Sequence, residues 1–341
     1  MNEKETKRIP MLDIIVPHYK EPWEVGEKFF AMLNLQRGID FSSFRVTVVN
    51  DGEENALPDE HFQNRPYQVR QIAIPHAGVS AARNAGLKAA EAEWVMFCDF
   101  DDMFVNVYAM RDIMNVMPAH GMDMLWTDIL IEDKRPGTEV VINEYGQNTI
   151  LIHGKLYRRS FLNEHQMWFD TDLHYSEDTC FNRILGTILP YERTGKIHTT
   201  APLYVWTDTE NSVTRTKGKQ FDWADQVFES DRKVCEAFKK NLSYDRYCGM
   251  VYRTIADTYY VLNREKIPNE LKALKGKTIA FWKEHKKEFD SVPGKTANEI
   301  LTAVCKNHFH AANKQTCSDK IVSDFTIKNW LIKLSKEGDA P

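Results

Sequence analysis

The sequence lacks three features that would indicate a membrane or secreted protein. No run approaches about 18 uninterrupted apolar residues, which excludes an ordinary transmembrane helix. The first eight residues, Met1–Arg8, are polar and do not form the apolar core of a signal peptide. The six cysteines show no close pairing typical of a disulfide scaffold. We therefore expect a reduced, soluble, cytoplasmic protein whose contact with a membrane, if it has one, is peripheral.

Charge is distributed unevenly along the 341 residues. Hydrophobic residues make up 43% of the chain, which is ordinary for a globular protein and excludes a largely disordered one. The net charge of −5 combines a balance of −12 over residues 1–214 (20 basic, 32 acidic) with +7 over residues 215–341 (24 basic, 17 acidic). This asymmetry and the chain length predict two units with a boundary near residue 215. Solvated surfaces explain the two charge balances equally well.

The first unit alternates short apolar strands with helices. This alternation predicts an open, mostly parallel α/β sheet, in which ligands bind beyond the carboxyl ends of the strands. Three of the strands end in polar residues, at His18–Lys20, Asn50–Gly52 and Asp99–Asp102. The expected strands are 12–16 (ended by Pro17), 44–49, 69–74 and 94–98, and the expected helices are 22–36 and 80–92.

Three aspartates lie within four residues at the end of the fourth strand: Asp99, Asp101 and Asp102. Carboxylates this close repel one another, and a cation relieves the repulsion. Their hard oxygen atoms suit Mg²⁺ or Mn²⁺, particularly an ion that also contacts diphosphate oxygens. An Asx-rich turn that caps the next helix explains the same residues without a metal.

The polar strand ends belong to a longer series of short motifs in the first unit. The most specific is the nine-residue run GVSAARNAG at 78–86. In chain order, the others are VPHY at 16–19, VVNDG at 48–52, FCDFDD at 97–102, GKLYRRSF at 154–161, SED at 176–178, LYVW at 203–206 and NSVT at 211–214.

In order and spacing these motifs resemble the family 2 glycosyltransferases, over about residues 12–215. The resemblance implies an inverting enzyme that moves a sugar, of hexosyl type, from a nucleotide-sugar donor to an acceptor hydroxyl. It also implies a GT-A fold over residues 1–215, a Rossmann-like and mostly parallel sheet with flanking helices. A helical C-terminal domain is expected at 216–341. One departure is Asn50, where the family more often has a second aspartate.

The resemblance assigns a nucleotide site to the strand ends. Tyr19 would stack on the nucleobase, and Pro17 would shape the loop beside it. Asp51 would accept a hydrogen bond from the base imide, which favours uracil or thymine and so a UDP-linked donor. Arg83 would approach the donor, or would brace the loops together with Asn84. Each residue also has a plainer interpretation, with Tyr19 as a rim aromatic and Asp51 as a turn residue.

The resemblance also assigns a Mn²⁺ or Mg²⁺ site of the DxD type. Asp101 would ligate the ion, and Asp99 would contact the ribose or a metal-bound water. His198 is a candidate for a further metal or diphosphate contact. The ion would bridge the diphosphate and stabilise the charge on the leaving group.

The acidic pair Glu177 and Asp178 would supply the catalytic base. In a single displacement, the acceptor hydroxyl loses its proton while it attacks the anomeric carbon, and a nearby carboxylate can take that proton. Matching to the family makes Asp178 the base and Glu177 the neighbour that orients it or the acceptor. Ser176, Glu177 and Asp178 are also a good capping sequence for a helix, and both roles are compatible.

The second unit has helical periodicity. Apolar residues at spacings of three and four predict helices over about 221–238 and 244–262, and the capping box Thr296–Glu299 predicts the start of another. Its basic balance suits an anionic acceptor such as a phosphate-bearing polymer, DNA or a membrane surface, but a solvated lysine face explains it as easily. This unit could also mediate homo-oligomer formation.

Two other functions stay open at this stage. One is a non-catalytic sugar-nucleotide-binding or scaffolding protein of the same fold. The other is a nucleotidyltransferase, which would need metal and nucleotide but no acceptor base at Glu177 and Asp178. The sequence identifies neither the sugar nor the acceptor, which could be a carbohydrate, a glycopolymer or another hydroxyl-bearing molecule.

Overall fold

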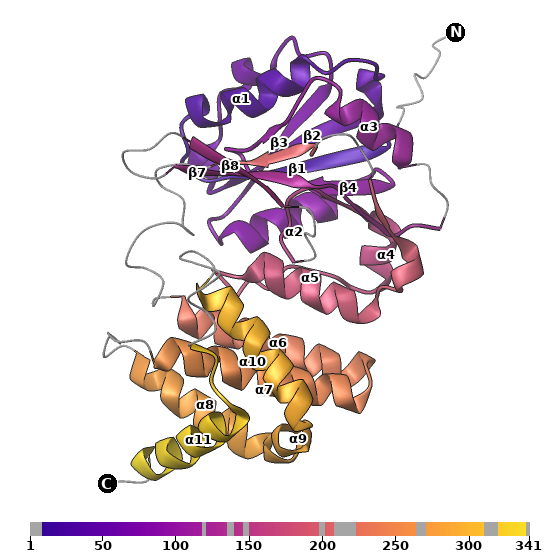
Figure 1. Cartoon of the computed structure of the whole chain (residues 1–341). Helices are drawn as coiled ribbons and strands as arrows, with labels where there is room; N and C mark the ends of the chain where they lie inside the picture. Colours follow the sequence, from indigo (N-terminus) through magenta and orange to yellow (C-terminus); the bar gives the residue numbers. More distant parts are fainter. Residues whose placement is uncertain are drawn as a thin grey trace. The chain divides into compact units, whose positions relative to one another are not determined.

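The computed structural model of the protein divides into two compact units, residues 1–212 and 213–341, which are described separately below (Figure 1). The predicted boundary near residue 215 lies outside the described residues and stays a prediction. The structure describes residues 9–117, 121–134, 140–145, 150–197, 202–207, 223–263, 271–309 and 320–338.

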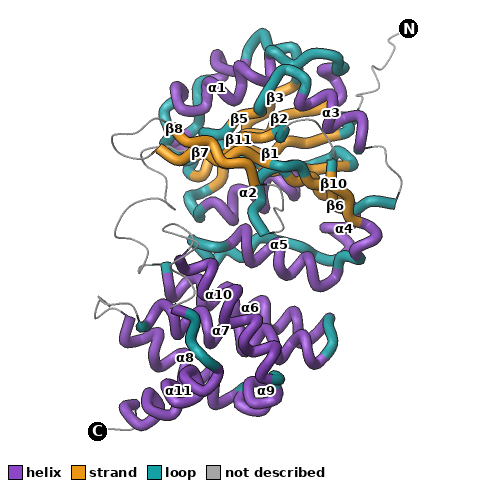
Figure 2. Tube along the Cα trace, in the orientation of Figure 1, coloured by secondary structure: helices purple, strands orange, loops and turns teal. Residues whose placement is uncertain are grey.

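A seven-stranded sheet forms the centre of the first unit (Figure 2). In spatial order its strands are β10 (Thr194–Lys196), β6 (Met124–Trp126), β9 (Lys155–Arg158), β4 (Trp94–Phe97), β1 (Leu12–His18), β2 (Phe44–Asp51) and β3 (Gln68–Ile74). β1 pairs in parallel with both β2 and β4, β2 with β3, and β10 with β6. Only β9 runs antiparallel to its neighbours. The predicted mostly parallel α/β sheet is therefore confirmed.

Helices cover both faces of this sheet (Figure 1). A smaller sheet lies beside it, in the order β5 (Met103–Phe104), β11 (Tyr204–Trp206), β7 (Ile129–Lys134) and β8 (Val140–Tyr145). The helices are α1 (Trp23–Asn34) and α3 (Ala109–Val116) on one face, and α2 (Val79–Ala89), α4 (Arg159–Glu164) and α5 (Glu177–Ile188) on the other.

Alternation along β1 explains the two layers of the core. Ile14 and Val16 point to one face and pack with Phe29 of α1, whereas Ile15 points to the other face and packs with Ala82 of α2. These side chains are fully buried, as expected for a central parallel strand with helices on both sides.

Two details of α2 follow from its glycines. Gly78 precedes the helix with φ +90°, a conformation that favours glycine. Gly86 lies directly against β1, because a Cβ atom there would fall 2.3 Å from the Cγ2 of Ile15. The run at 78–86 therefore sets both where the helix starts and how closely it approaches the sheet.

The prediction that Pro17 ends the first strand is wrong. β1 continues to His18, and Pro17 pairs in register with Val49. β4 pairs with β1 only as far as Ile15, so at Pro17 a single neighbouring strand continues. A proline without an N–H group is tolerated where the sheet has one open side.

The second unit is helical, as predicted. Its buried side chains are mainly aliphatic and aromatic, and Tyr252 stacks on Phe289 with ring centroids 4.8 Å apart. The helix expected to start at Thr296 begins two residues earlier, at Gly294. None of the helices in the described ranges is long and apolar enough to span a bilayer. The helices are α6 (Ala224–Asn241), α7 (Tyr244–Leu262), α8 (Lys272–Glu284), α9 (Lys286–Ser291), α10 (Gly294–Phe309) and α11 (Asp324–Gly338).

Candidate active site

The carboxyl ends of β1, β2 and β4 lie side by side at one edge of the large sheet. The three strands are adjacent and parallel, so residues that follow them share that edge. His18 ends β1, Asp51 ends β2, and Asp99 follows β4 by two residues. The clustering of polar strand ends expected from the sequence is therefore present.

Asp51 is almost fully enclosed by hydrogen-bond donors from the loop after β3. Its Oδ1 accepts from the backbone N–H of Ala77 at 2.7 Å, and its Oδ2 accepts from that of Gly78 at 2.9 Å. His76 Nδ1 lies 2.8 Å from the same Oδ2. The His76 ring also stacks on Tyr19, with centroids 4.3 Å apart and planes 11° apart. The two residues predicted to hold a nucleobase therefore lie around one imidazole.

Asn50, the departure from the family pattern, has a structural role. It is fully buried, and its Oδ1 lies 2.8 Å from His18 Nδ1. Its Nδ2 donates to Gln71 Oε1 at 3.0 Å. Asn50 thus connects β1 with β3 through side chains, and an amide supplies both the donor and the acceptor that this position needs.

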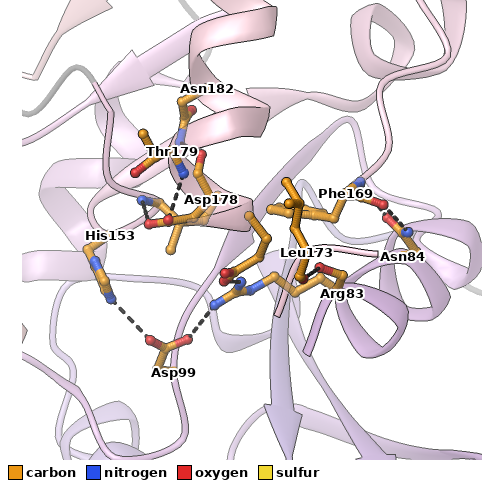
Figure 3. A network of polar contacts seen from close by, with 12 residues as sticks. Arg83, Asn84, Asp99, His153, Phe169, Leu173, Asp178, Thr179 and Asn182 are labelled. Carbon is orange, nitrogen blue, oxygen red and sulfur yellow. Dashed lines mark hydrogen bonds and ion pairs between the residues drawn. The ribbon is translucent and has the colours of Figure 1, made fainter. Parts of the chain in front are cut away.

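The guanidinium of Arg83 in α2 contacts two carboxylates: that of Asp99 just after β4 (Figure 3) and that of Glu177 at the start of α5. Its guanidinium donates to Glu177 Oε1 at 2.6 Å and to Asp99 Oδ1 at 3.0 Å. Burial alone would lower the pKa of Arg83, but the charges of Asp99, Glu177 and Asp178 raise it, so the residue stays a cation. These contacts link α5 to the end of β4, which agrees with a bracing role, and the approach of Arg83 to the donor stays a prediction.

The carboxylates on either side of Arg83 differ in their pKa values. Burial would raise the pKa of Asp99, but Arg83 and His153 outweigh burial and lower it. At Glu177 burial is the largest effect, and its pKa is raised despite the contact with Arg83. The side chain of Asp99 is also 30% exposed, whereas that of Glu177 is 12% exposed. Asp99 is therefore the member of the pair that remains ionised and reachable.

His153 forms a second connection to the aspartate cluster (Figure 3). Its Nε2 lies 3.1 Å from Asp99 Oδ2 and 3.6 Å from Asp102 Oδ2. Trp206 stacks on the imidazole at 4.9 Å with planes 16° apart. Burial would lower the pKa of His153, but the two aspartates raise it. The Trp206 ring therefore covers one face of His153.

Asp102 is a buried, anchored residue. It is fully buried, accepts from the Tyr204 hydroxyl at 2.7 Å and accepts from the backbone N–H of Thr207 at 2.9 Å. Burial raises the pKa of this carboxyl group well above its usual value, although the nearby His153 opposes the shift.

Two carboxylates and an imidazole from this cluster lie close enough to share an ion. Potential ligand atoms of Asp99, Asp102 and His153 fall within 4.8 Å of one another. Carboxylate and imidazole ligands suit Mn²⁺, so the donor set fits the expected cofactor. Asp101 is partly exposed beside this group but does not belong to it, and its role as a ligand stays a prediction. His198 lies outside the described residues.

Asp178 lies in the first turn of α5 with its carboxylate held by two backbone groups. Its Oδ1 accepts from the N–H of Thr179 at 2.6 Å, and its Oδ2 accepts from that of Ile152 at 3.3 Å. Ser176 precedes the helix but makes no capping hydrogen bond through its side chain. A carboxylate oxygen has two lone pairs, so each oxygen can accept a second hydrogen bond. The helix start therefore fixes this partly exposed carboxylate and leaves it able to take a proton.

Lys155 lies beneath this loop. It is fully buried at the start of β9, and its ammonium donates to the backbone carbonyl of Leu151. Burial lowers its pKa to about 7. Lys155 therefore supports the loop before β9 through the Leu151 carbonyl.

Two residues near the site, His76 and His153, were not recognised from the sequence. Asp102 was recognised, but its anchoring to Tyr204 and Thr207 was not. His153 directly precedes the motif at 154–161, which was the signal available for it. His76 lies in the loop between β3 and the run at 78–86, and no motif includes it. Periodicity does not reveal such partners, because they are defined by contacts between distant segments.

The fold and the strand-end carboxylates define an α/β enzyme of the GT-A class. Residues 13–184, just over half of the chain, match the family described as Glycosyl transferase family 2. The chain therefore belongs to glycosyltransferase family 2.

Curated relatives carry glycosyltransferase names. EpsJ of Bacillus subtilis (strain 168), an uncharacterized glycosyltransferase, is 22% identical over 281 residues, which are 76% of this chain and 77% of EpsJ. TarS of Staphylococcus aureus (strain Mu50), a poly(ribitol-phosphate) beta-N-acetylglucosaminyltransferase, is 27% identical over 183 residues. That match covers 49% of this chain and 31% of TarS, so it includes less than a third of that enzyme.

Solved structures of residues 1–349 of S. aureus TarS share the fold. The complex with UDP has a TM-score of 0.60 at 19% identity and covers 87% of both chains. The complex with UDP-GlcNAc has a TM-score of 0.60 at 18% identity and covers 88% of this chain and 87% of the other.

Proposed function

We propose that the protein is an inverting, metal-dependent glycosyltransferase that uses a uridine nucleotide sugar and employs Asp178 as its general base. One observation carries the proposal. Arg83 joins Glu177, the neighbour of Asp178 in α5, to Asp99 at the end of β4. The carboxylate that would activate the acceptor and the strand end that would contact the donor are thereby held in one rigid unit.

In the proposed reaction, an acceptor hydroxyl hydrogen-bonds to Asp178. As its oxygen attacks the anomeric carbon, the proton passes to the carboxylate and the bond between that carbon and the nucleotide oxygen breaks. The electron pair of the broken bond leaves with the nucleoside diphosphate. One displacement inverts the anomeric carbon, and no covalent sugar–enzyme intermediate forms. Glu177 is bonded to Arg83 and orients the first turn of α5 rather than taking the proton.

The donor nucleotide would bind over the ends of β1 and β2. Tyr19, with 37% of its surface exposed, would stack on the base, and Asp51 would accept the imide N–H of uracil. Pro17, the last residue but one of β1, would fix the backbone from which Tyr19 extends.

A divalent cation, Mn²⁺ or Mg²⁺, would be held by Asp99 and Asp101, with His198 as a further candidate ligand. Asp99 and Asp101 are both partly exposed, and the buried His153 contacts the Asp99 carboxylate from inside the protein. When bound, the ion neutralises the diphosphate and stabilises the charge on the leaving group.

The acceptor would be an anionic glycopolymer. The basic balance of residues 215–341 favours a phosphate-bearing chain, and TarS, the relative that matches about half of this sequence, is named for a poly(ribitol-phosphate) acceptor. UDP-N-acetylglucosamine is accordingly the first donor to test.

The test uses the full chain. Release of UDP from UDP-GlcNAc, UDP-glucose and, as a control, release of GDP from GDP-mannose are measured with Mn²⁺ or EDTA. Each reaction is run with poly(ribitol phosphate), with a neutral glycan, or without acceptor. We expect Mn²⁺-dependent transfer from a UDP-sugar to the anionic polymer. Binding of UDP-sugars without transfer or hydrolysis would favour a sugar-nucleotide-binding role, and preference for GDP-mannose would overturn the uridine assignment.

A further inference from the structure

The nucleobase surface of the protein is covered by one of its own side chains. Tyr19 is exposed enough to accept a stacked ring, but His76 lies parallel to it at 4.3 Å. An imidazole at this spacing fills the place that a stacked nucleobase needs.

The same histidine covers Asp51. Its Nδ1 donates to Oδ2 of the carboxylate at 2.8 Å, and the Asp51 side chain is only 4% exposed. The other two donors to Asp51 are the backbone N–H groups of Ala77 and Gly78, which cannot leave without unfolding the start of α2. His76 is 52% exposed and belongs to a loop, so rotation of its side chain frees Asp51 at small cost.

We propose that His76 occupies the nucleobase site of the free protein and that the uracil of the donor displaces it, taking over both of its contacts. The proposal rests on the uridine donor proposed above. His76 therefore sets how tightly the donor binds, although it does not contact the reacting atoms.

The exchange conserves the interactions that Asp51 and Tyr19 make. A flat imidazole leaves the tyrosine face and a flat pyrimidine replaces it. The Nδ1–H of His76 leaves the carboxylate, and the N3–H of uracil replaces that donor. The released imidazole is hydrogen-bonded by water.

Cytosine cannot complete this exchange. The N3 atom of cytosine is a hydrogen-bond acceptor, and so is the Asp51 carboxylate that it would face. After His76 leaves, this carboxylate oxygen would lack the donor that it had, and leaving a polar group unpaired in this way is costly. The exchange therefore disfavours cytidine nucleotides, since they must displace His76 as uridine nucleotides do but have no N3–H to replace its bond to Asp51. Uridine against cytidine is the matched pair for a test.

The protein also supplies a matched control histidine. His61 stacks on Trp23 with centroids 4.4 Å apart and planes 10° apart, the same geometry as His76 on Tyr19. His61 reaches neither Asp51 nor Tyr19 in any described contact. His61→Ala therefore removes a stacked imidazole without opening the proposed nucleobase site.

Calorimetry with the full chain measures binding of UDP and CDP in the presence of Mn²⁺. Removing the competing imidazole in His76→Ala should tighten UDP binding about three- to tenfold, the value of one hydrogen bond. CDP binding should stay weak, and His61→Ala should match the wild type. Equal or weaker UDP binding by His76→Ala, with normal wild-type binding, overturns the role of His76 and leaves the uridine donor intact. Failure of every form to bind UDP overturns both.

Imidazole NMR provides a second readout that a purely structural role would not move. With ¹⁵N-labelled histidine, the signal missing from His76→Ala identifies His76. Addition of UDP to the wild type should shift this signal to that of a solvent-exposed imidazole, whereas CDP should leave it unchanged at the same concentration. A His76 signal that stays unchanged at saturating UDP contradicts displacement.

Discussion

Arg83 donates a hydrogen bond of 2.6 Å to Glu177, a residue 94 positions away in the sequence. The contact joins the beginning of α2 to the beginning of α5, and the guanidinium also reaches Asp99. Arg83 is buried and is the cation that both carboxylates share, while Asp99 also contacts His153.

Replacement of Arg83 should therefore destabilise the first unit. Arg83→Met leaves Glu177 and Asp99 without their cation, and we expect a loss of about 3–5 kcal/mol of unfolding free energy, as for a broken buried ion pair. Urea unfolding monitored by tryptophan fluorescence measures it. Glu177→Gln, which retains an oxygen to accept from Arg83, is the control and should lose much less. Equal losses for both variants would show that charge on Glu177 itself carries the stability.

Asp178→Asn should separate catalysis from helix capping. The amide has nearly the same shape, and its single oxygen can still accept from the backbone N–H of Thr179, whereas its Nδ2 cannot accept from that of Ile152. The variant should therefore fold with a stability loss of about 1 kcal/mol and keep its donor affinity. Without a basic oxygen, transfer should fall about 10²- to 10⁴-fold, or roughly 3–5 kcal/mol of barrier. Turnover and UDP-sugar binding measured on the folded variant check this. A near-wild-type rate would move the base elsewhere, with Glu177 as the next candidate.

Asp101 and Asp102 should respond differently to the same substitution. Asp101→Asn should lose Mn²⁺-dependent UDP binding, because the diphosphate then lacks its cation. Asp102→Asn should retain it, because the side chain is fully buried, its amide oxygen can accept from Thr207, and its Nδ2 can donate to the Tyr204 hydroxyl instead of accepting from it. Calorimetry of UDP with and without Mn²⁺ distinguishes the two. If Asp102→Asn loses Mn²⁺-dependent UDP binding and Asp101→Asn keeps it, the ion is bound by the cluster of Asp99, Asp102 and His153 instead.

Lys155 should make stability depend on pH. In the unfolded chain lysine keeps its proton up to its ordinary pKa of 10.5, whereas burial lowers the pKa in the folded protein to about 7. Between these values the unfolded state binds more protons, so the unfolding free energy rises with pH, by up to about 1.4 kcal/mol per pH unit. The gain is absent below pH 7 and complete above pH 10.5.

The measurement is urea unfolding at several pH values between 7 and 10. Lys155→Met should flatten the rise seen in the wild type, whereas Lys88→Met, which replaces an exposed lysine of α2, should leave it unchanged. A persistent rise in Lys155→Met would assign the pH dependence to another group.

The first unit was predictable up to β4, because the signals there are local, whereas the smaller sheet and the strands β6, β9 and β10 were not predicted. A parallel strand buried on both faces is mostly apolar, so β1, β2 and β4 could be recognised from runs such as Phe44–Val49, although β1 and β2 also bury Asp13, Arg45 and Thr47. Their polar ends could be placed together because parallel strands end at the same edge. Pro17 was misread, because whether a proline ends a strand depends on how many neighbours the strand has at that point, and this is a property of the sheet.

The partners of the site residues were harder to predict. Asp51 was recognised, but His76, which covers it, comes 25 residues later in a loop without a motif. His153 lies 54 residues from Asp99, and only the folded chain brings them together. The roles of Asp178 and Asp101 stay predictions, since they depend on ligands.

Gly86 makes the position of the charged Arg83 side chain depend on how α2 packs against β1. Gly86 lies one helical turn after Arg83, on the side of α2 that meets β1, and only a hydrogen atom fits between this residue and Ile15. Any larger side chain would lift the helix from the sheet and draw the guanidinium away from both Asp99 and Glu177. Protein interiors are close-packed, so the addition of one methyl group between α2 and β1 would also change the distances from Arg83 to Asp99 and Glu177. The reach of Arg83 is thus fixed by an apolar contact that no ligand touches.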